Sequence, residues 1–408
     1  MIHKAECCRI CGNQNLVTVL DLGEQALTGV FPAHRDERVT SGPLRLVKCA
    51  GDNFCGLVQL SQSYDLGEMY GDNYGYRSGL NASMVRHLQS KVALISKMIS
   101  LAESDIVLDI GSNDGTTLGF YPNIGLNLIG IDPTAVKFRQ FYKPHIRVVP
   151  DFFSAALFHR EFHGRKARVV TSFSMFYDLE RPMEFMREVN SILADDGIWV
   201  FEQSYMPMML DHNSYDTVCH EHLEYYCLKQ IKWMTDRCGL KIVDVSFNDV
   251  NGGSFSVTVA KSDSAFPDCS NLAEILAREA ALGLDGLEPY LEFAARVSDS
   301  RAELVKFVRD AVGAGLRVAA LGASTKGNVL LQYCGFSEKE IFAVGEVNHD
   351  KFGRLTPGTL IPIIAEKELL SLKPDFLIVL PWHFRDTFLK LAGGYSKIVF
   401  PLPRLEVH

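Results

Sequence analysis

The sequence lacks several features that would assign it to a broad class of protein. No apolar run approaches the roughly 20 residues that a membrane-spanning helix needs. The first residues, MIHKAECCRICG, contain no apolar signal-peptide core. Positive charge is in the minority: the formal net charge of −8 argues against a broad nucleic-acid-binding surface. We therefore expect a cytosolic protein that binds neither a membrane nor a nucleic acid.

One common metal motif is also missing. Helical zinc proteases place two histidines four residues apart, so that both side chains lie on one face of a helix. Here His220 and His222 are separated by Glu221 alone, and such a pair shares a face only in an extended chain. The spacing therefore excludes the helical zinc-protease site.

What the chain does contain is ordinary for a globular protein. Apolar residues make up 47% of it and charged residues 22%, and 408 residues predict two or three domains. Ten cysteines in a cytosolic chain are more often metal ligands or core residues than disulfides.

Four of the cysteines form two pairs, one C-x2-C and one widened to C-x5-C. Four thiolates make a closed tetrahedral site, which is typical of structural zinc. The candidate ligands are Cys8, Cys11, Cys49 and Cys55. The alternatives are that Cys7 replaces one of them, or that some are buried free thiols. A segment as small as residues 1–62 has little core of its own, so we expect the metal to supply much of its folding free energy.

The segment DIVLDIGSNDGTTLGF predicts an apolar strand, a glycine turn and the start of a helix. Gly111 and Gly115 are expected where the backbone approaches a ligand. The next strand, NLIGID, ends in Asp132, at the place where an acid can bind ribose hydroxyls. This is not the dinucleotide-binding G-x-G-x-x-G pattern. Asp-x-Gly-x-Asn-Asp-Gly followed by a strand-end acid resembles the class I S-adenosylmethionine (SAM) methyltransferases.

Further strands complete the sheet that this resemblance implies. HIRVVPDFF, ARVVTSFSMFYDL and GIWVFEQS bring the parallel strands to five, and KIVDVSFND and SFSVTVA follow as a closing hairpin. The resemblance implies a SAM site formed by Asp109, Gly111, Asn113, Asp114, Gly115, Asp132, Asp151, Phe152 and Ser174. For Phe152, Met175 and Phe176, a place in the hydrophobic core is the alternative.

The segment YDTVCHEHLEYYCL follows the fifth of these strands and precedes a predicted helix, LKQIKWMTDRCGL. Ligands of open α/β sheets bind beyond the carboxyl ends of the strands. Two histidines, a glutamate and several tyrosines at that edge favour acid/base chemistry. The alternative is that the histidines cap helices or satisfy buried carbonyl groups.

Residues 300–408 predict a second parallel sheet. ELVKFVRDAVGAG is its expected first helix, and RVAALGAST, FAVGEVN and FLIVLPWH are its expected strands. Gly322, Lys326 and Gly327 could hold a phosphate, although G-A-S-T-K-G has too few residues between its glycines for a Walker loop. The alternative is a degenerate domain that serves for packing only.

Nearly the whole chain is similar to the three-domain sugar C-methyltransferases that act on nucleotide-linked 4-keto-deoxyhexoses. The similarity rests on Cys-Arg-Ile-Cys, Tyr-Asp-x-x-x-His-Glu-His, Asn-Gly-Gly-Ser and Gly-Ala-Ser-Thr-Lys-Gly-Asn. It implies an α/β fold with a class I SAM-methyltransferase sheet, an N-terminal zinc module and a C-terminal Rossmann-like domain. The expected parts are a zinc-binding module (1–62), a helical connector carrying active-site tyrosines (63–98), the SAM domain (99–262), a second helical connector (263–299) and the substrate domain (300–408).

The resemblance also implies the roles of single residues. His222 is expected to remove the C3 proton of the sugar as a neutral base, with Glu221 orienting it or contacting the substrate, and His220 is the second candidate. The family has a tyrosine where this sequence has Cys219, so the donors to the ketone oxygen are expected among Tyr76, Tyr225, His220 or a water. The expected substrate-binding residues are Tyr74, Arg77, Asn251 and Lys326.

Other functions share part of this pattern. An O- or N-methyltransferase would use the same SAM residues and differ only in its acceptor. A non-catalytic scaffold and a NAD-dependent oxidoreductase built on the C-terminal domain are further alternatives. The sequence leaves open the sugar, its nucleotide (dTDP, GDP or CDP), the stereochemistry at C3, and whether the protein is a monomer or a dimer.

Overall fold

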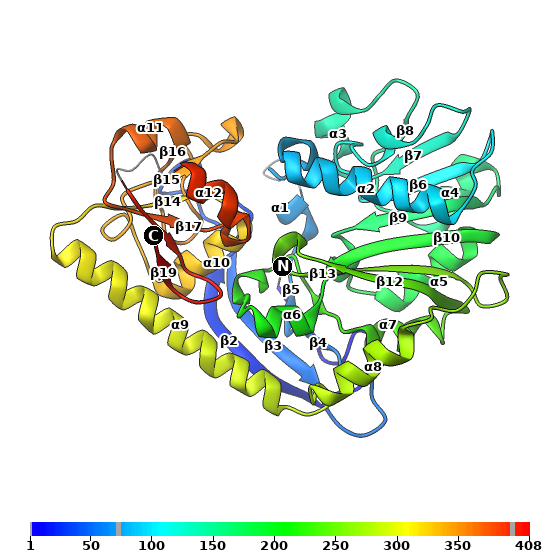
Figure 1. Cartoon of the computed structure of the whole chain (residues 1–408), viewed down its shortest axis with the longest axis horizontal. Helices are drawn as coiled ribbons and strands as arrows, with labels where there is room; N and C mark the ends of the chain where they lie inside the picture. Colours follow the sequence, from blue (N-terminus) through cyan, green and yellow to red (C-terminus); the bar gives the residue numbers. More distant parts are fainter. Residues whose placement is uncertain (1, 71–74, 392–395) are drawn as a thin grey trace.

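The computed structural model describes residues 2–70, 75–391 and 396–408, and Figure 1 shows their arrangement. Two α/β halves lie side by side, one around a central sheet and one at the C-terminal end of the chain. Three long elements run below the C-terminal half and toward the half with the central sheet. They are the strands β2 (Leu16–Ala26) and β3 (Ser41–Cys49) and the helix α9 (Glu288–Gly313).

The central sheet has seven strands in the order β12-β13-β10-β9-β6-β7-β8. The strands are β6 (Ile106–Ile110), β7 (Asn127–Ile131), β8 (Arg147–Val149), β9 (Ala167–Phe173), β10 (Leu193–Ser204), β12 (Leu240–Asn248) and β13 (Ser254–Lys261). The pairs from β8 to β10 are parallel, and β13 pairs antiparallel with both β10 and β12. β6 is buried along its whole length, as expected of a strand covered on both faces. The structure confirms the predicted sheet of five parallel strands and a hairpin.

Helices cover both faces of this sheet. Val92 and Ile95 of α2 (Ala82–Met98) pack in the core of one face. The other face is covered by α4 (Ala155–Phe162), α5 (Pro182–Ile192) and α7 (Leu228–Thr235). The helix expected after the glycine turn is only a 3-10 turn, Leu118–Phe120, because a glycine within it and a proline just beyond it disfavour helix.

The N-terminal module contains a four-stranded antiparallel sheet in the order β11-β4-β3-β2. β4 is Val58–Leu60, and β11, Glu224–Tyr225, comes from the segment that directly follows the two histidines. A strand of the central domain therefore completes the sheet of the cysteine module.

The C-terminal sheet has the order β16-β15-β14-β17-β18-β19, parallel except for the last strand. Its strands are β14 (Val318–Leu321), β15 (Val344–Glu346), β16 (Ile363–Ala365), β17 (Phe376–Val379), β18 (Lys397–Phe400) and β19 (Glu406–Val407). The three strands predicted here are confirmed as β14, β15 and β17. Helix α9 begins well before the expected boundary at residue 300, because its buried side chains at helical spacing already start at Tyr290, Phe293 and Val297. The last part of the expected helical connector and the first helix of the domain are thus one element, while α8 (Leu272–Ala281) is a separate helix of that connector.

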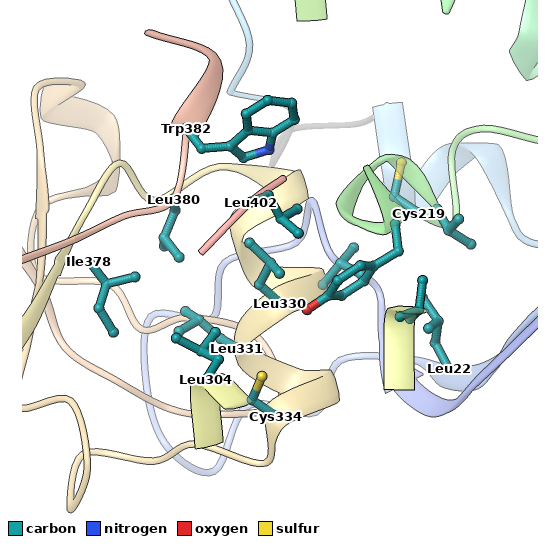
Figure 2. Close-up of a cluster of buried hydrophobic side chains, with 14 of the residues drawn as sticks. Leu22, Cys219, Leu304, Leu330, Leu331, Cys334, Ile378, Leu380, Trp382 and Leu402 are labelled. Atoms are coloured by element: carbon teal, nitrogen blue, oxygen red, sulfur yellow. The ribbon is translucent and has the colours of Figure 1, made fainter. Parts of the chain in front are cut away.

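A single hydrophobic core joins the N-terminal module to the C-terminal half. Figure 2 shows Leu22 of β2, Cys219 of the histidine segment and Leu304 of α9 around α10 (Thr325–Cys334). The N-terminal module has little core of its own, as expected, and it packs into a core that is shared with more distant parts of the chain.

The remaining β-strands and α-helices are short. They are β1 (His3–Lys4), β5 (Gln62–Ser63), α1 (Leu66–Tyr70), α3 (Ala135–Phe138), α6 (Met206–Asp211), α8 (Leu272–Ala281), α11 (Glu366–Ser371) and α12 (Arg385–Leu391). No helix within the described ranges combines the length and the apolar character that crossing a membrane requires.

Candidate functional site

The histidine segment follows β10 and the short helix α6, and it contains a tight turn. The backbone N–H of His222 donates to the carbonyl oxygen of Cys219 at 3.2 Å. The chain is therefore not extended here, and the two histidines do not share a face. Their side chains have different neighbours.

His222 lies against the ring of Tyr177, with 4.3 Å between the ring centres. Its Nδ1 is 2.9 Å from the carbonyl oxygen of Thr217. A carbonyl only accepts, so Nδ1 carries the proton and Nε2 keeps a free lone pair. Burial, with the Lys326 charge as a smaller cause, lowers the pKa of His222 to about 3. The imidazole is therefore neutral near pH 7, as a general base must be.

His220 has a different environment. It is 0% exposed, its ring makes an edge contact with Tyr64 at 4.7 Å, and Nδ1 is 3.4 Å from Thr28 Oγ1. Burial lowers the pKa of His220 to about 4. Its Nε2 has no hydrogen-bond partner among the described residues. The expected role of His220 as the second candidate in catalysis stays a prediction.

Glu221 and Cys219 flank this buried histidine. Thr28 Oγ1 donates to Glu221 at 3.4 Å, and a Cβ on Gly29 would collide with the same carboxylate. Burial raises the pKa of Glu221. It also raises the pKa of the Cys219 thiol well above its usual value, and only 1% of that residue is exposed. Cys219 is thus a neutral, buried thiol where the family has a tyrosine.

Lys326 reaches the site from the first turn of α10. Its Nζ donates to the carbonyl oxygen of Asn251 at 2.8 Å. The ammonium interacts electrostatically with Asp216, Cys219 and His222. Burial lowers the pKa of Lys326, and the Asp216 carboxylate opposes that change. Two residues predicted to bind substrate, Asn251 and Lys326, are therefore in direct contact beside the candidate base.

Asp216 and Trp382 are site residues that sequence analysis missed. Asp216 is 1% exposed, and Trp382 Nε1 donates to its Oδ2 at 2.9 Å. Burial raises the pKa of Asp216, while Lys326 and Trp382 both lower it. The two residues lie far apart in the sequence, so no local pattern could have linked them.

Asp178 was also missed. Tyr70 donates from its hydroxyl to Asp178 Oδ2 at 2.9 Å, and Oδ1 has no hydrogen-bond partner. Burial, and to a lesser degree the nearby Glu221 charge, raises the pKa of Asp178 well above its usual value. The signal in the sequence was its place just after the fourth parallel strand.

The expected tyrosines and arginine are distributed around this centre. Tyr225 is 4% exposed, and its hydroxyl makes a long contact of 3.4 Å to Thr217 O. Tyr76 is 49% exposed, and Arg77 lies over the ring of Phe141 at 3.9 Å. Tyr74 lies outside the described residues.

The predicted SAM loop follows β6. Gly111 has φ +73, and a Cβ there would lie 3.1 Å from Met175, so glycine is required. The side chain of Asn113 accepts from Ser78 N at 2.9 Å and donates to Tyr76 O at 3.1 Å. These side-chain contacts hold the connector over the loop.

Asp114 holds the connector in the same way. Its Oδ2 accepts from Gly79 N at 2.9 Å and lies 3.7 Å from Arg77 Nε, while Oδ1 accepts from the Thr116 hydroxyl at 2.6 Å. A Cβ on Gly115 (φ +74) would meet the ring of Tyr142. Asp114 thus holds the connector against the loop, and Gly115 leaves room for the ring of Tyr142.

Asp132 ends β7 beside that loop. Oδ1 accepts from Thr134 N and from the Thr134 hydroxyl, both at 2.6 Å, and Oδ2 accepts from Asn113 N at 2.7 Å. A carboxylate offers about four acceptor positions, so one position on Oδ2 remains for a ribose hydroxyl. The site fits SAM with one hydrogen bond from this residue instead of two.

The other predicted SAM residues differ in accessibility. Asp109 is 3% exposed, accepts from the Thr171 hydroxyl at 2.5 Å, and has its pKa raised to about 7 by burial. Phe152 is 52% exposed, so it is available to an adenine ring, and the adjacent Asp151 is exposed as well. Ser174 follows β9 with φ +54, an uncommon conformation that often marks a functional turn. Phe176, in contrast, is fully buried in the core.

The four predicted metal ligands meet at one point. Their sulfur atoms lie within 4.8 Å of one another, with Cys8 and Cys55 at 3.3 Å and Cys11 and Cys49 at 3.5 Å. Zn–S bonds of about 2.3 Å in a tetrahedron need sulfurs about 3.8 Å apart, so the cluster fits zinc. The hydrogen bond from the Cys55 thiol lowers the pKa of Cys8 to about 6. Cys7 is exposed and is not part of the cluster.

Three family models match consecutive parts of the chain. A zinc binding domain matches residues 8–70, a methyltransferase domain matches residues 81–245, and a C-methyltransferase C-terminal domain matches residues 249–403. The C-methyltransferase NovU of Streptomyces niveus is 30% identical over 408 residues, which cover 98% of this chain and 96% of that protein.

Solved structures resemble parts of the chain more weakly. The CcbJ methyltransferase of Streptomyces caelestis is 11% identical, with 43% of this chain and 90% of that chain covered and a TM-score of 0.34. A chain from a complex of the Haloferax volcanii Trm112 methyltransferase activator with a methyltransferase is 14% identical, with 43% and 90% covered and a TM-score of 0.36.

We predict that Cys49→Ser abolishes zinc binding and lowers the melting temperature by at least about 5 °C, because the module depends on the metal for its folding. Elemental analysis and calorimetry measure the two effects. Cys7→Ser, which alters an exposed cysteine outside the cluster, should keep both zinc and melting temperature. Native protein without stoichiometric metal would contradict the assignment.

We predict that Asp132→Ala weakens SAM binding by about 1.5–3 kcal/mol, the value of one hydrogen bond to a charged group. Isothermal titration calorimetry measures the affinity. Asp195→Ala, which removes an exposed acid of the same domain, should leave the affinity unchanged. Equal affinity of Asp132→Ala and the wild type would place the ribose elsewhere.

Proposed function

The chain belongs to the family of SAM-dependent C-methyltransferases with a zinc-binding N-terminal domain, and we propose that it methylates C3 of a nucleotide-linked 4-keto-deoxyhexose. One observation carries the proposal: where the three parts of the chain meet, a neutral histidine lies close enough to a partly buried ammonium group for that charge to lower the pKa of the histidine. Removing a proton from the carbon beside a ketone needs a base, and it is helped by a hydrogen-bond donor or a positive charge near the ketone oxygen.

His222 is the proposed base. Its Nδ1–H is committed to Thr217 O, so Nε2 is the atom that would take the C3 proton. The same hydrogen bond fixes the orientation of the ring and supports the positive charge that the ring acquires. Glu221, two residues from Cys219 and close to Thr28, is proposed to contact the substrate beside the base.

Lys326 is the proposed electrophile at the ketone oxygen. The expected donors are less suitable: His220 is fully buried, and the Tyr225 hydroxyl is directed at Thr217 O. Tyr76 remains accessible and could add a hydrogen bond. An ammonium group in a site with little water stabilises a developing enolate far more than it would in water.

The two groups depend on each other through their charges. The Lys326 charge contributes to the low pKa of His222. A histidine with so low a pKa would by itself be a weak base. As negative charge develops on the ketone oxygen it offsets the ammonium charge, so the pKa of His222 rises while the proton moves. The arrangement therefore strengthens the base only when the enolate forms.

SAM supplies an electrophilic methyl group when it is bound. The residues proposed to hold it are the loop after β6, Asp132 and the exposed Phe152. The sheet edge that carries them also carries Ser174 and the histidine segment, so the enolate carbon can face the cofactor. Positioning of this kind supplies much of the catalysis in a bond-forming step between two bound reactants.

The C-terminal domain is proposed to bind the nucleotide end of the substrate. Asn348, which follows β15, donates from Nδ2 to Gly75 O at 3.1 Å, so this domain reaches the connector of the SAM domain. Arg77 of the connector is proposed to contact the substrate at this junction, as is Tyr74, which lies outside the described residues. The product should show its new methyl group on carbon in an NMR spectrum; a methyl group on oxygen or nitrogen would refute C-methylation.

We predict that His222→Asn folds and binds SAM normally but slows methyl transfer by about 10²–10⁴, the range for loss of a general base. It should also lose solvent deuterium exchange at C3 of the sugar in the absence of SAM, which NMR measures. His163→Asn, an exposed histidine of the same domain in the left-handed conformation that asparagine tolerates, is the matched control. Full activity of His222→Asn would remove the proposed base.

We predict that Lys326→Met lowers kcat by about 10²–10³, as loss of one oxyanion donor does. It should also raise the pKa of His222, because the neighbouring positive charge is gone. Steady-state kinetics and NMR titration of the imidazole measure the two effects. Lys306→Met, on the exposed face of α9, should change neither. Wild-type kcat in Lys326→Met would assign the enolate oxygen to another donor.

A further inference from the structure

Arg9 lies inside the turn between two of the cysteines that form the metal cluster. Its side chain is 7% exposed. The guanidinium donates to the carbonyl oxygens of Leu60 (2.8 Å), Gln62 (3.3 Å) and Leu223 (3.5 Å). The backbone N–H of Arg9 donates to Gln59 Oε1 at 2.9 Å. One residue of the cysteine turn therefore binds both β4 and the segment of the proposed base.

The residue that Arg9 reaches, Leu223, directly follows His222. Its carbonyl also accepts from Leu60 N at 2.8 Å, and its own N–H donates to Tyr177 O at 2.8 Å. Tyr177 is the residue whose ring packs on His222. The backbone at Leu223 is thus fixed from the cysteine module on one side and from the SAM domain on the other.

Glu224 continues this link. It pairs with Gln59 in the β11–β4 ladder, and its Oε1 is 3.7 Å from Arg9 Nε. Neither carboxylate oxygen of Glu224 has a hydrogen-bond partner, although the side chain is fully buried. Arg9 is accordingly the cation that faces this buried acid.

A second contact joins the cluster to the same region. Gln230, in the first turn of α7, donates from Nε2 to the carbonyl oxygen of Cys55 at 2.8 Å, while its Oε1 accepts from Cys227 N at 2.9 Å. The chain after the histidine segment is therefore tied to the cluster at both ends: through Arg9 at Leu223 and through Cys55 at α7.

We propose that Arg9 is a positioning residue, which transmits the geometry of the metal-bearing turn to the backbone that carries His222. The inference rests on the proposed function for the role of His222. It goes beyond a structural zinc site, because the cluster then sets the position of the proposed base as well as the stability of the module.

Arginine suits this role because its planar fork presents donors in fixed directions. A lysine at this position would keep the charge but could not bind three carbonyl oxygens in the same geometry. Zinc would hold the turn that carries Arg9 through Cys8 and Cys11. A displacement of about 1 Å at a reacting group can lower a rate about 10²-fold.

The test compares Arg9→Lys with Arg45→Lys in the zinc-loaded enzyme. Arg45 is a matched control: it lies on β3 of the same module and pairs with exposed Asp21 at 2.7 Å. We expect Arg9→Lys to retain its zinc and its SAM affinity, with kcat lowered by about 10²-fold and KM little changed. C3 deuterium exchange should fall in parallel, and amide exchange of residues 219–226 should speed up. Arg45→Lys should match the wild type throughout.

A double variant, Arg9→Met with Glu224→Gln, removes both buried charges together and so covers the case in which Arg9→Lys fails to fold. It should show the same loss of kcat and the same faster amide exchange. Wild-type kcat and wild-type protection of residues 219–226 in a folded Arg9 variant would overturn the proposal. Loss of zinc from Arg9→Lys would overturn it too, because Arg9 would then stabilise the cluster itself.

The amide-exchange measurement also separates this inference from the proposed function. If the wild type neither exchanges the C3 proton nor methylates a 4-keto sugar nucleotide, the proposed function fails. Amide exchange would still show whether Arg9 protects residues 219–226, because that measurement requires no substrate.

Discussion

Burial of ionisable groups is the constraint on which the site depends. It lowers the pKa of His222 and Lys326 and raises the pKa of Asp216 and Glu221, so every shift favours the uncharged form. A buried group stays charged only when a group of opposite charge lies near it, and Asp216 is that group for Lys326. Trp382, by donating to Asp216, favours the charged form of that carboxyl group. The proposed base can then be neutral while a cation stands next to it.

The same burial requires three distant parts of the chain to be in place together. Thr28 of the N-terminal module contacts Glu221, and Lys326 of the C-terminal half contacts Asn251 of the SAM domain. The hydrophobic cluster of Figure 2 holds Leu22, Cys219 and Leu304 in one core. Separating any of these parts would admit water, and the pKa shifts would relax with it. The packing of these three parts and the pKa values of the site are therefore coupled, because both depend on the exclusion of water.

Sequence reasoning succeeded where the determinants are local. The glycine turn expected after an apolar strand is present at Gly111, with φ +73, and the C-x2-C turn contributes two of the four clustered cysteines, because neighbouring residues impose both features. It could not foresee the different surroundings of His220 and His222, since a turn closed by His222 N and Cys219 O cannot be read from a spacing of two. It also missed Asp216 with Trp382, and Arg9 with Leu223. These contacts depend on how separate elements pack, and no periodicity within one element encodes that.

Cys219 shows how the packing of the domains bears on the mechanism. A buried thiol whose pKa is well above its usual value is neutral and a weak donor, so it cannot take over hydrogen bonding from a tyrosine hydroxyl. Its side chain instead joins the apolar cluster around α10, the helix whose first turn carries Lys326. In the proposed mechanism, the positive charge that replaces the hydroxyl therefore comes from the C-terminal half. That half then contributes to the reaction itself, which a domain serving only for packing would not do.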